Sequence, residues 1–565
     1  MNSAASPDLP SRSFAVGRRG GRFPVLLGSV SIVIAAIVLI PILTVIAIAL
    51  SGTGADWPHL VNYVLPQAAR NTFLLLSLVA LGTAIVGVGS AWLIVAYDFP
   101  LRRVFAWALV LPFAVPPYLA AYAFAEFFHY LGPVQTAIRS IFGFASSREY
   151  WFPDIRSTWG AALVVGSVTY PYVYLSTRVI FLMQGRNIAD AAQTLGAKPS
   201  RVFWRVLLPV ARPAIVAGLA LVLMETINDI GAVEHLGVRT LTLSVYSTWL
   251  NRGSLEGAAQ IALVMLILVF ALLTAERIAR HRQRFHNGRA TQIKVRPPRK
   301  PLTGWRGGMA VSLASLPILL GFGIPLLVFG RYALNRTYQI AEPALAKALF
   351  TSLTTAAATA LLTVLFAILL LFAVRFARSL PMAILVRFCV VGYAMPGTIL
   401  ALGLLIALGR FDNFIDGLAR DHLGVSTGLL ISGSAGAIVL ACTIRFLALA
   451  EGTLQAGLEK LPPNLDNAAR SLGHSAFMSA IKVLLPLMKP AIATAAILVF
   501  VDTIKELSAT ILLRPFGFNT LATYVYENAS RGAPEDAAMA ALTIIAASIV
   551  PVILLSRPLI RDSDV

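Results

Sequence analysis

Apolar segments long enough to cross a membrane recur along the whole chain. A helix needs about 20 predominantly apolar residues to cross ~30 Å of hydrocarbon. Twelve segments satisfy this requirement, so the pattern predicts an all-α polytopic membrane protein with about 12 transmembrane helices. The expected spans are residues 25–50, 71–97, 104–130, 158–182, 212–234, 258–280, 309–331, 349–375, 382–409, 427–449, 489–512 and 535–556.

Composition and charge support this interpretation and indicate an orientation. The chain has 565 residues, of which 58% are hydrophobic and only 13% are charged. A soluble protein would carry about 25% charged residues. With both termini in the cytoplasm, the cytoplasmic loops hold roughly twice as many Lys and Arg residues as the opposite loops, as the positive-inside rule requires. Membrane orientation therefore explains the net charge of +20, and we expect no nucleic-acid partner.

One polar segment occurs twice, 277 residues apart. The sequence Asp-Ala-Ala-Gln-Thr-Leu-Gly begins at Asp190, and Asn-Ala-Ala-Arg-Ser-Leu-Gly begins at Asn467. Each copy continues into a basic residue followed by Val-Leu-Leu-Pro, which ends at Pro209 and Pro486. Six expected spans separate corresponding points, and an even number returns the chain to the same side. The sequence therefore predicts two parallel six-helix repeats.

These repeats set the expected division of the chain into two transmembrane domains. A basic stretch between them contains two consecutive prolines and is expected to be a cytoplasmic linker that contacts anionic headgroups. The expected boundaries are a cytoplasmic tail at 1–24, a first transmembrane domain at 25–281 with its repeated loop at 188–209, the linker at 282–308, a second transmembrane domain at 309–557 with its loop at 465–486, and a cytoplasmic tail at 558–565.

Each repeated loop is expected to contain a short helix that contacts another protein. Gly196 and Gly473 are suited to end these helices in a left-handed conformation. Ser200 and Ser475 are expected to cap the helix that follows. A helix this short is marginal on its own in water, and its paired alanines permit close approach to a neighbouring surface. The alternative is an amphipathic helix that lies in the membrane interface.

The two loops resemble the EAA loops of binding-protein-dependent ABC transporter permeases. The resemblance covers both halves and implies the type I importer (MetI-like) fold, in which these loops form coupling helices that dock into ATPase subunits. This chain differs at the first position, where Asp190 and Asn467 replace the glutamate that gives the motif its name. The residues assigned to coupling by the resemblance are Asp190, Ala191, Ala192, Gly196, Pro209, Asn467, Ala468, Ala469, Gly473 and Pro486.

A narrower resemblance concerns the substrate. Residues 224–240 and 502–520, together with the fusion of two halves, resemble the ferric-iron uptake permeases. Fused permeases for thiamine and phosphonate share this architecture and remain alternatives. The resemblance implies a homodimer of ABC ATPase subunits on the cytoplasmic face, a periplasmic solute-binding protein, and a location in the bacterial inner membrane.

The chain is not expected to be an enzyme. It contains no Gly-x-x-x-x-Gly-Lys-Ser/Thr phosphate-binding loop, so ATP and magnesium are expected to be used by the partner subunit and no cofactor is assigned to this chain. An ion-coupled secondary transporter is the rival class, and it would need no docking helices and no ATPase.

Four carboxylates fall inside expected spans. Glu225 and Asp229 are four residues apart, as are Asp502 and Glu506, and this spacing predicts that each pair shares one face of a helix. Ionisable groups at such depth commonly mark a pathway or a pairing network. One hypothesis is that they line the translocation path and contact a cation, although no metal ligands are assigned.

The other hypothesis for these carboxylates is structural. They would form ion pairs with Lys505, Arg445 or Arg514, or cap a break in a helix. Prolines at 116, 117 and 396 are expected to kink two further spans, which would suit either a hinge or a fixed cavity wall.

Overall fold

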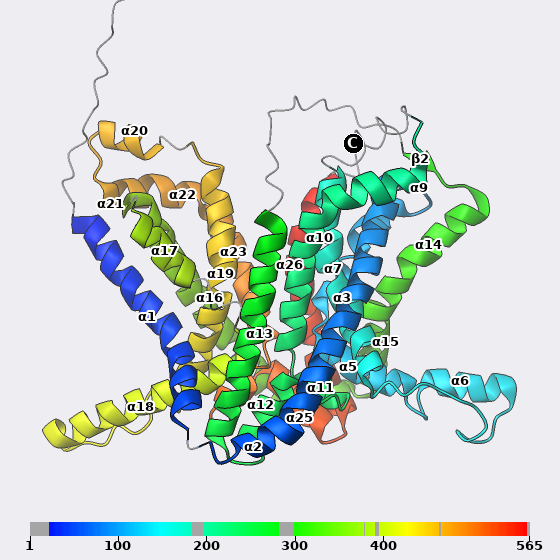
Figure 1. Cartoon of the computed structure of the whole chain (residues 1–565), viewed down its shortest axis with the longest axis horizontal. Coiled ribbons are helices and arrows are strands. Elements are labelled where there is room, and N and C mark those ends of the chain that lie inside the picture. Colours follow the sequence, from blue (N-terminus) through cyan, green and yellow to red (C-terminus); the bar gives the residue numbers. More distant parts are fainter. Residues whose placement is uncertain are drawn as a thin grey trace, which may run out of the picture.

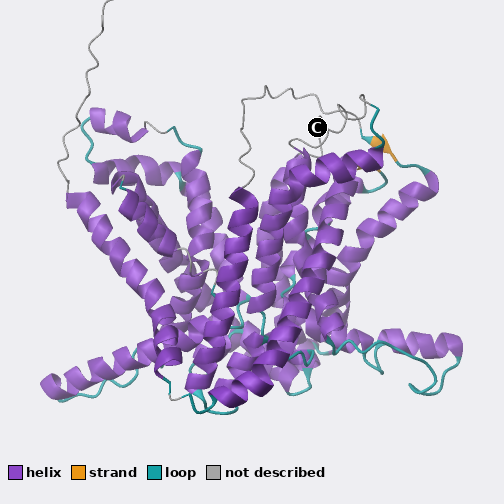
Figure 2. Cartoon of the chain, viewed as in Figure 1, coloured by secondary structure: helices purple, strands orange, loops and turns teal. Residues whose placement is uncertain are grey.

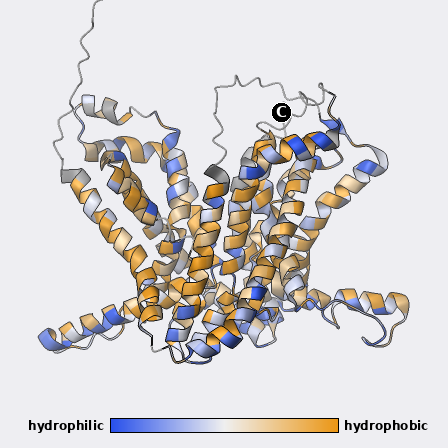
Figure 3. Cartoon of the chain, viewed as in Figure 1, coloured by the Kyte–Doolittle hydropathy of each residue, from blue (hydrophilic) through white to orange (hydrophobic). Residues whose placement is uncertain are grey.

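The computed structural model of the chain is almost entirely helical (Figures 1 and 2). Hydrophobic residues dominate along most of the long helices (Figure 3), and the predicted all-α polytopic fold is confirmed. The segments that follow the two repeated loops lie at one end of the molecule, at the top of Figure 1, which we call the loop face. The structure describes residues 22–52, 54–182, 196–281, 299–377, 379–389, 392, 395–462 and 465–561.

The first half begins with a long helix and ends with another that returns to the loop face. Its elements are α1 (Arg22–Ser51), α2 (Trp57–His59), η1 (Leu60–Val64), α3 (Leu65–Ala96), β1 (Tyr97–Asp98), α4 (Arg102–Ala108), η2 (Leu111–Ala114), α5 (Pro117–Phe128), α6 (Pro133–Phe142), α7 (Thr158–Ile180), α9 (Pro199–Val202), η4 (Phe203–Leu207), α10 (Leu208–Asn228), α11 (Gly231–His235), α12 (Leu241–Leu250) and α13 (Leu255–His281).

The second half follows the same order. Its elements are β2 (Lys300–Pro301), α14 (Gly304–Ile318), η5 (Leu319–Gly323), α15 (Ile324–Asn335), η6 (Thr337–Ala341), α16 (Pro343–Ala377), α17 (Leu380–Cys389), α18 (Gly397–Leu423), α19 (Ala435–Glu459), α20 (Leu465–Ser471), α21 (Ala476–Ser479), η8 (Ala480–Leu484), α22 (Leu485–Leu487), α23 (Lys489–Ile504), α24 (Thr510–Leu513), α25 (Leu521–Ser530), η9 (Pro534–Ala537) and α26 (Ala538–Arg561).

Two of the twelve predicted spans are broken. Among the described residues, nine helices are long and apolar enough to cross a membrane, and two bent pairs pass the same test together. The expected span at 104–130 is one such pair, bent by 95° between η2 and α5. The expected span at 382–409 is divided between α17 and α18. Pro116 and Pro396 precede α5 and α18 in extended conformations, because proline lacks the amide that a continuous helix requires.

The two halves are parallel repeats that exchange their first helices. The hydroxyl of Thr72 accepts a hydrogen bond from the amide of Leu241 at 2.9 Å, and Ser352 and Leu521 form the matching bond at 2.7 Å. In contrast, α1 packs against α16, α17 and α18 of the second half, while α15 of the second half packs against α5 of the first. Each half is therefore completed by a helix from the other.

The end of the linker is attached to the first half at the loop face. Strands β1 and β2 pair in parallel over two residues each. The amide of Leu302 then donates to the carbonyl of Asp98 at 2.8 Å. Residues 282–298 of the linker, and the tails at 1–21 and 562–565, lie outside the described residues.

Helix α7 forms the expected span at 158–182 and is held between α3 and α10 by glycines. A Cβ atom added to Gly87 of α3 would lie 2.7 Å from Cβ of Val173, and one added to Gly218 of α10 would lie 2.8 Å from Cα of the same residue. The close approach of these three helices therefore requires glycine at both positions. Gly89, two residues further along α3, has no atom within 4 Å of its added Cβ.

This contact gives the first prediction. Gly87→Ala should destabilise the purified protein by about 1–3 kcal/mol, because overpacking forces the backbones of α3 and α7 apart. The matched control Gly89→Ala should leave stability unchanged or slightly raised. Thermal unfolding in detergent, followed by tryptophan fluorescence, measures both. Equal melting temperatures for the two variants would contradict the packing described here.

Candidate functional site

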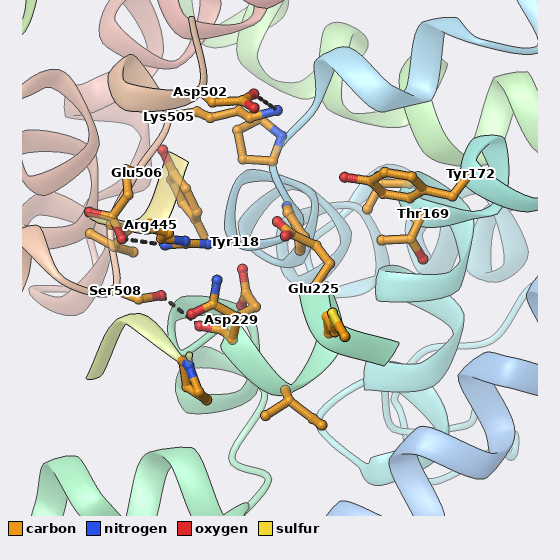
Figure 4. A pocket seen from close by; sticks show the side chains of 18 of the residues that line it. Tyr118, Thr169, Tyr172, Glu225, Asp229, Arg445, Asp502, Lys505, Glu506 and Ser508 are labelled. Carbon is orange, nitrogen blue, oxygen red and sulfur yellow. Dashed lines mark hydrogen bonds and ion pairs between the residues drawn. The ribbon is translucent and has the colours of Figure 1, made fainter. Parts of the chain in front are cut away.

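A cavity of about 80 Å³ lies where the two halves meet. One water molecule needs about 10–15 Å³ by this measure, so the cavity has room for several. Its walls come from η2, α5, α7 and α10 of the first half and from α19, α23 and the segment after α23 of the second. The charged residues that line it are Glu225, Asp229, Arg445, Asp502, Lys505 and Glu506 (Figure 4).

The four predicted carboxylates all reach this cavity, but the prediction that each pair shares one helix face is wrong. Helix α10 ends at Asn228, and Asp229 has an extended backbone with φ −76° and ψ 118°. Helix α23 ends at Ile504, two residues before Glu506. The i, i+4 rule assumes a continuous helix, and in both halves the helix stops between the two carboxylates.

Asp229 and Glu506 cap the short helices that follow the breaks. Oδ1 of Asp229 accepts a hydrogen bond from the amide of Ala232 at 2.7 Å. Oε1 of Glu506 accepts from the amide of Ala509 at 2.8 Å, and Oε2 accepts from the amide of Thr510 at 3.0 Å. Each carboxylate therefore satisfies backbone amides that would otherwise be unpaired in a low-dielectric environment.

Glu506 is also neutralised by Arg445 of α19. The guanidinium lies 2.7 Å from Oε1 of Glu506, and the two side chains are 10% and 1% exposed. A buried ion pair is tolerated when further hydrogen bonds satisfy its remaining lone pairs, and Glu506 meets this condition through its amide bonds. The position 277 residues before Arg445 is Val168, so only the second half carries this arginine.

The second predicted pair differs in its degree of neutralisation. Nζ of Lys505 lies 2.8 Å from Oδ1 of Asp502 and 4.9 Å from the centre of the Phe113 ring. Glu225, which matches Asp502 in the repeat, is half-buried and has no hydrogen bond or ion pair within the described part of the chain. Its carboxylate projects into the open space of the cavity (Figure 4).

Three polar residues that the sequence analysis did not select join the two halves below the cavity. Oδ1 of Asn228 accepts from the amide of Gly397 at 2.6 Å, and the hydroxyl of Ser508 donates to the carbonyl of Asn228 at 2.7 Å. The counterpart of Gly397, 280 residues earlier, is Pro117, which has no amide to donate. Their only sequence signal is that Asn228 falls in register with Lys505.

A second contact between the halves lies closer to the opposite face. The hydroxyl of Tyr526 in α25 donates to Glu234 of α11 at 2.7 Å. Tyr246 of α12, which is 280 residues before Tyr526, lies 3.5 Å from it, oxygen to oxygen. Related positions of the two repeats therefore meet each other, as expected near a pseudo-two-fold axis. These bonds close the interface between the halves on the side away from the loop face.

The repeated loops have the predicted glycine turns. Gly196 and Gly473 have φ values of +82° and +87°. Pro209 lies in the first turn of α10 and Pro486 in the first turn of α22. Ser475 caps α21 as predicted, accepting from the amide of Met478.

The expected cap at Ser200 is wrong, because α9 begins one residue earlier at Pro199, a residue favoured in the first turn of a helix.

The helix predicted within the second loop is present as α20. The amide of Leu472 donates to the carbonyl of Ala468, and the amide of His474 donates to that of Ala469. Leu472 is 82% exposed at the loop face. Asn467 lies within α20, whereas Asp190, Ala191 and Ala192 of the first loop lie outside the described residues.

The described residues contain no group of three or more His, Cys, Asp or Glu side chains that could hold a metal ion. The cavity carboxylates are dispersed around its wall and are divided between capping, ion pairing and, at Glu225, the open space.

Comparison with known proteins places this geometry in a family. The model of the binding-protein-dependent transport system inner membrane component matches residues 83–284 and 370–561. A Fe(3+)-transport system permease protein of Haemophilus influenzae is 24% identical over 87% of this chain and 90% of its own length.

Shorter relatives match about one half of the chain. A sulfate transport system permease protein of Escherichia coli K12 is 30% identical over 43% of this chain and 84% of its own length. A putative 2-aminoethylphosphonate transport system permease protein of Salmonella paratyphi A is 28% identical over 38% and 74%. The family model covers more than half of the chain in two copies, and these relatives are permeases rather than enzymes. The chain therefore belongs to the family of inner membrane components of binding-protein-dependent transport systems.

Proposed function

We propose that this chain is the permease subunit of an ATP-driven importer that moves ferric iron across the inner membrane. The observation that carries the proposal is the cavity between the two halves, which contains four carboxylates and two cationic side chains. The likeness to the Fe(3+)-transport permease extends over both halves, whereas the sulfate and phosphonate relatives each match about one half. A periplasmic binding protein would deliver the substrate.

The proposed orientation puts the loop face and both termini in the cytoplasm. The bonds of Asn228 and Tyr526 between the halves then lie on the periplasmic side of the cavity. This arrangement corresponds to a state that is closed toward the binding protein. Import would require a second state in which these bonds are broken, and ATP would act by changing the relative stability of the two states.

The charge balance of the cavity favours a cation. Arg445 and Lys505 each lie within an ion pair with a cavity carboxylate, so neither provides an unneutralised positive charge for an oxyanion. Glu225 provides an unpaired negative group among the described residues. We assign the path to Glu225 with Asp502 and Lys505, and a structural and gating role to Asp229 and Glu506. Sulfate or phosphonate is the second candidate substrate, favoured by the shorter relatives alone.

Coupling to ATP hydrolysis is assigned to the two repeated loops. A homodimer of ATPase subunits would bind ATP and magnesium and would receive one loop in each subunit, while this chain would bind no cofactor. The exposed side chain of Leu472 supports this assignment, because an apolar residue with 82% exposure at the loop face is suited to contact a partner. The remaining coupling residues keep the roles implied by the sequence motif.

The proposed path predicts that Glu225→Gln lowers iron uptake by about tenfold, equivalent to ~1.4 kcal/mol, because the variant removes a negative charge from the cavity. The measurement is ⁵⁵Fe uptake into proteoliposomes that contain the assembled transporter and its binding protein. Glu225→Asp keeps the charge and should restore most of the uptake. Normal uptake by a correctly assembled Glu225→Gln transporter would exclude this residue from the path.

The docking assignment predicts that Leu472→Asp weakens association with the ATPase subunits by at least about tenfold, because a charge would be buried in an apolar contact. Co-purification and ATPase activity of the complex measure the effect. Phe516 is fully exposed at the opposite face, and Phe516→Asp is the matched control, which should leave association intact. If both variants retain the ATPase equally, α20 is not a docking helix.

The proposed closed state predicts that Tyr526→Phe raises ATPase activity in the absence of binding protein. The variant removes a hydrogen bond to a carboxylate that joins the two halves, a bond that contributes about 1.5–3 kcal/mol. Tyr524 of the same helix donates to Glu342 within the second half, so Tyr524→Phe should have no such effect. Identical basal activities in the two variants would show that the Tyr526 bond does not hold the closed state.

A further inference from the structure

Two helices leave the bundle sideways at the opposite face. Helix α6 and the outer part of α18 project in opposite directions, at the level where the other helices end (Figure 1). Each is followed by a loop that returns along it to the bundle (Figure 2). We call residues 133–157 the first arm and residues 410–434 the second arm. Although α18 is long and apolar enough to be counted as a span, its outer part lies outside the bundle.

In the first arm, the return loop and the adjoining chain cover the polar side of α6. The hydroxyl of Tyr150 donates to Oε1 of Gln135 at 2.7 Å. The amide of the Gln135 side chain donates to the carbonyl of Phe128 at 2.8 Å, and the guanidinium of Arg139 donates to the carbonyl of Tyr130 at 2.7 Å. The same guanidinium lies 4.0 Å from the centre of the Tyr130 ring. The polar groups of α6 are thus already paired within the chain.

In the second arm, two buried or half-buried aspartates perform the same task. Oδ2 of Asp412 accepts from the amide of Ser432 at 2.8 Å and from its hydroxyl at 2.6 Å. Oδ1 of Asp416 accepts from the amides of Thr427 at 2.6 Å and Gly428 at 3.0 Å. Because the aspartates are four residues apart, they lie on one side of the helix, and the return loop is fixed along that side.

The two arms share one register. Gln135 and Asp412 are 277 residues apart, as are Arg139 and Asp416, the same separation as between the repeated loops. The sides of the helices away from the return loops carry exposed apolar residues at spacings of three and four. The most exposed of these side chains are Ile141 (74%), Phe142 (68%), Phe414 (61%), Phe411 (49%) and Leu418 (41%). Figure 3 shows hydrophobic and polar residues alternating around both helices.

We propose that the arms lie in the membrane interface at the opposite face, with their apolar sides in the acyl chains and their return loops toward water. Figure 2 shows both return loops on the side of the helices away from the loop face. The apolar sides therefore point toward the hydrophobic layer that the spans cross. An amphipathic helix in this position inserts about 5–10 Å into the boundary between headgroups and acyl chains. Under the proposed orientation, this is the outer leaflet.

The arms are continuous with elements of the cavity, which gives lipid contact a mechanical consequence. Helix α18 begins at Gly397, whose amide is bonded to Asn228 at the junction of the two halves, and it ends in the second arm. Helix α5 lines the cavity at Tyr118 and leads into the first arm. Movement of either half must therefore tilt an arm in the interface or carry it with the half. The arms would hold the opposite face at a constant depth in the membrane.

The experiment places single probes on the two sides of each arm. Ile141→Cys and Phe414→Cys report on the apolar sides, and Arg148→Cys and Asn413→Cys are exposed controls on the first return loop and on another side of α18. Each is made in the full chain with Cys389 and Cys442 replaced by serine, labelled with a nitroxide and reconstituted in phosphatidylethanolamine and phosphatidylglycerol nanodiscs. Collision rates with oxygen, which partitions into lipid, and with a water-soluble nickel chelate are measured by electron paramagnetic resonance.

We expect the probes at 141 and 414 to collide at least about threefold more often with oxygen than with nickel, relative to the controls, because oxygen concentrates in the acyl region. Nickel access at both apolar sites equal to that of the controls would overturn the proposal. Loss of both kinds of collision on addition of the binding protein would show instead that the apolar sides are a protein-docking surface. Fluorescence quenching by brominated lipids from bimane at the same positions provides an independent reading.

Discussion

The requirement that every buried backbone amide be paired governs the centre of this molecule. In lipid, a helix satisfies its own backbone, and a break in it leaves amides that must find other acceptors. Helices α10 and α23 both break where the two halves meet, and a carboxylate from the breaking segment caps the next short helix in each. Acidic residues therefore occur deep in the protein for a structural reason. Only Glu225 and Asp502, which precede the breaks, are released from this task.

The two halves use this shared design unequally. Glu506 has Arg445 as a partner, and the matching position of the first half is Val168. Asn228 bonds Gly397 across the junction, whereas Lys505, its counterpart, pairs with Asp502 on its own helix and lies over an aromatic ring. The duplication thus preserved the backbone and its caps while the side chains at the junction diverged. A single pair of unlike halves can hold an asymmetric charge arrangement that two identical subunits cannot.

Much of the architecture could be predicted from the sequence, because hydropathy and the duplicated loop report directly on burial and topology. The glycine turns at 196 and 473 and the cap at Ser475 followed from local chemistry. The carboxylate geometry did not, because the spacing argument took α10 and α23 to be continuous. A capping signature was present in Asp229 and Glu506, each followed two residues later by Gly231 or Ser508, but a polar residue in an apolar run can also signify a pathway.

Exchange of the first helices limits how the halves can move. If each repeat moved as a rigid body, α1 would have to leave α16, α17 and α18, and α15 would have to leave α5. Gly403 of α18 approaches α1 so closely that an added Cβ would lie 2.2 Å from the carbonyl oxygen of Pro41. Such contacts behave as packed interiors that resist continuous deformation. The units that move are therefore better defined by packing than by sequence: the body of one repeat with the first helix of the other, hinged where α10 and α23 are broken.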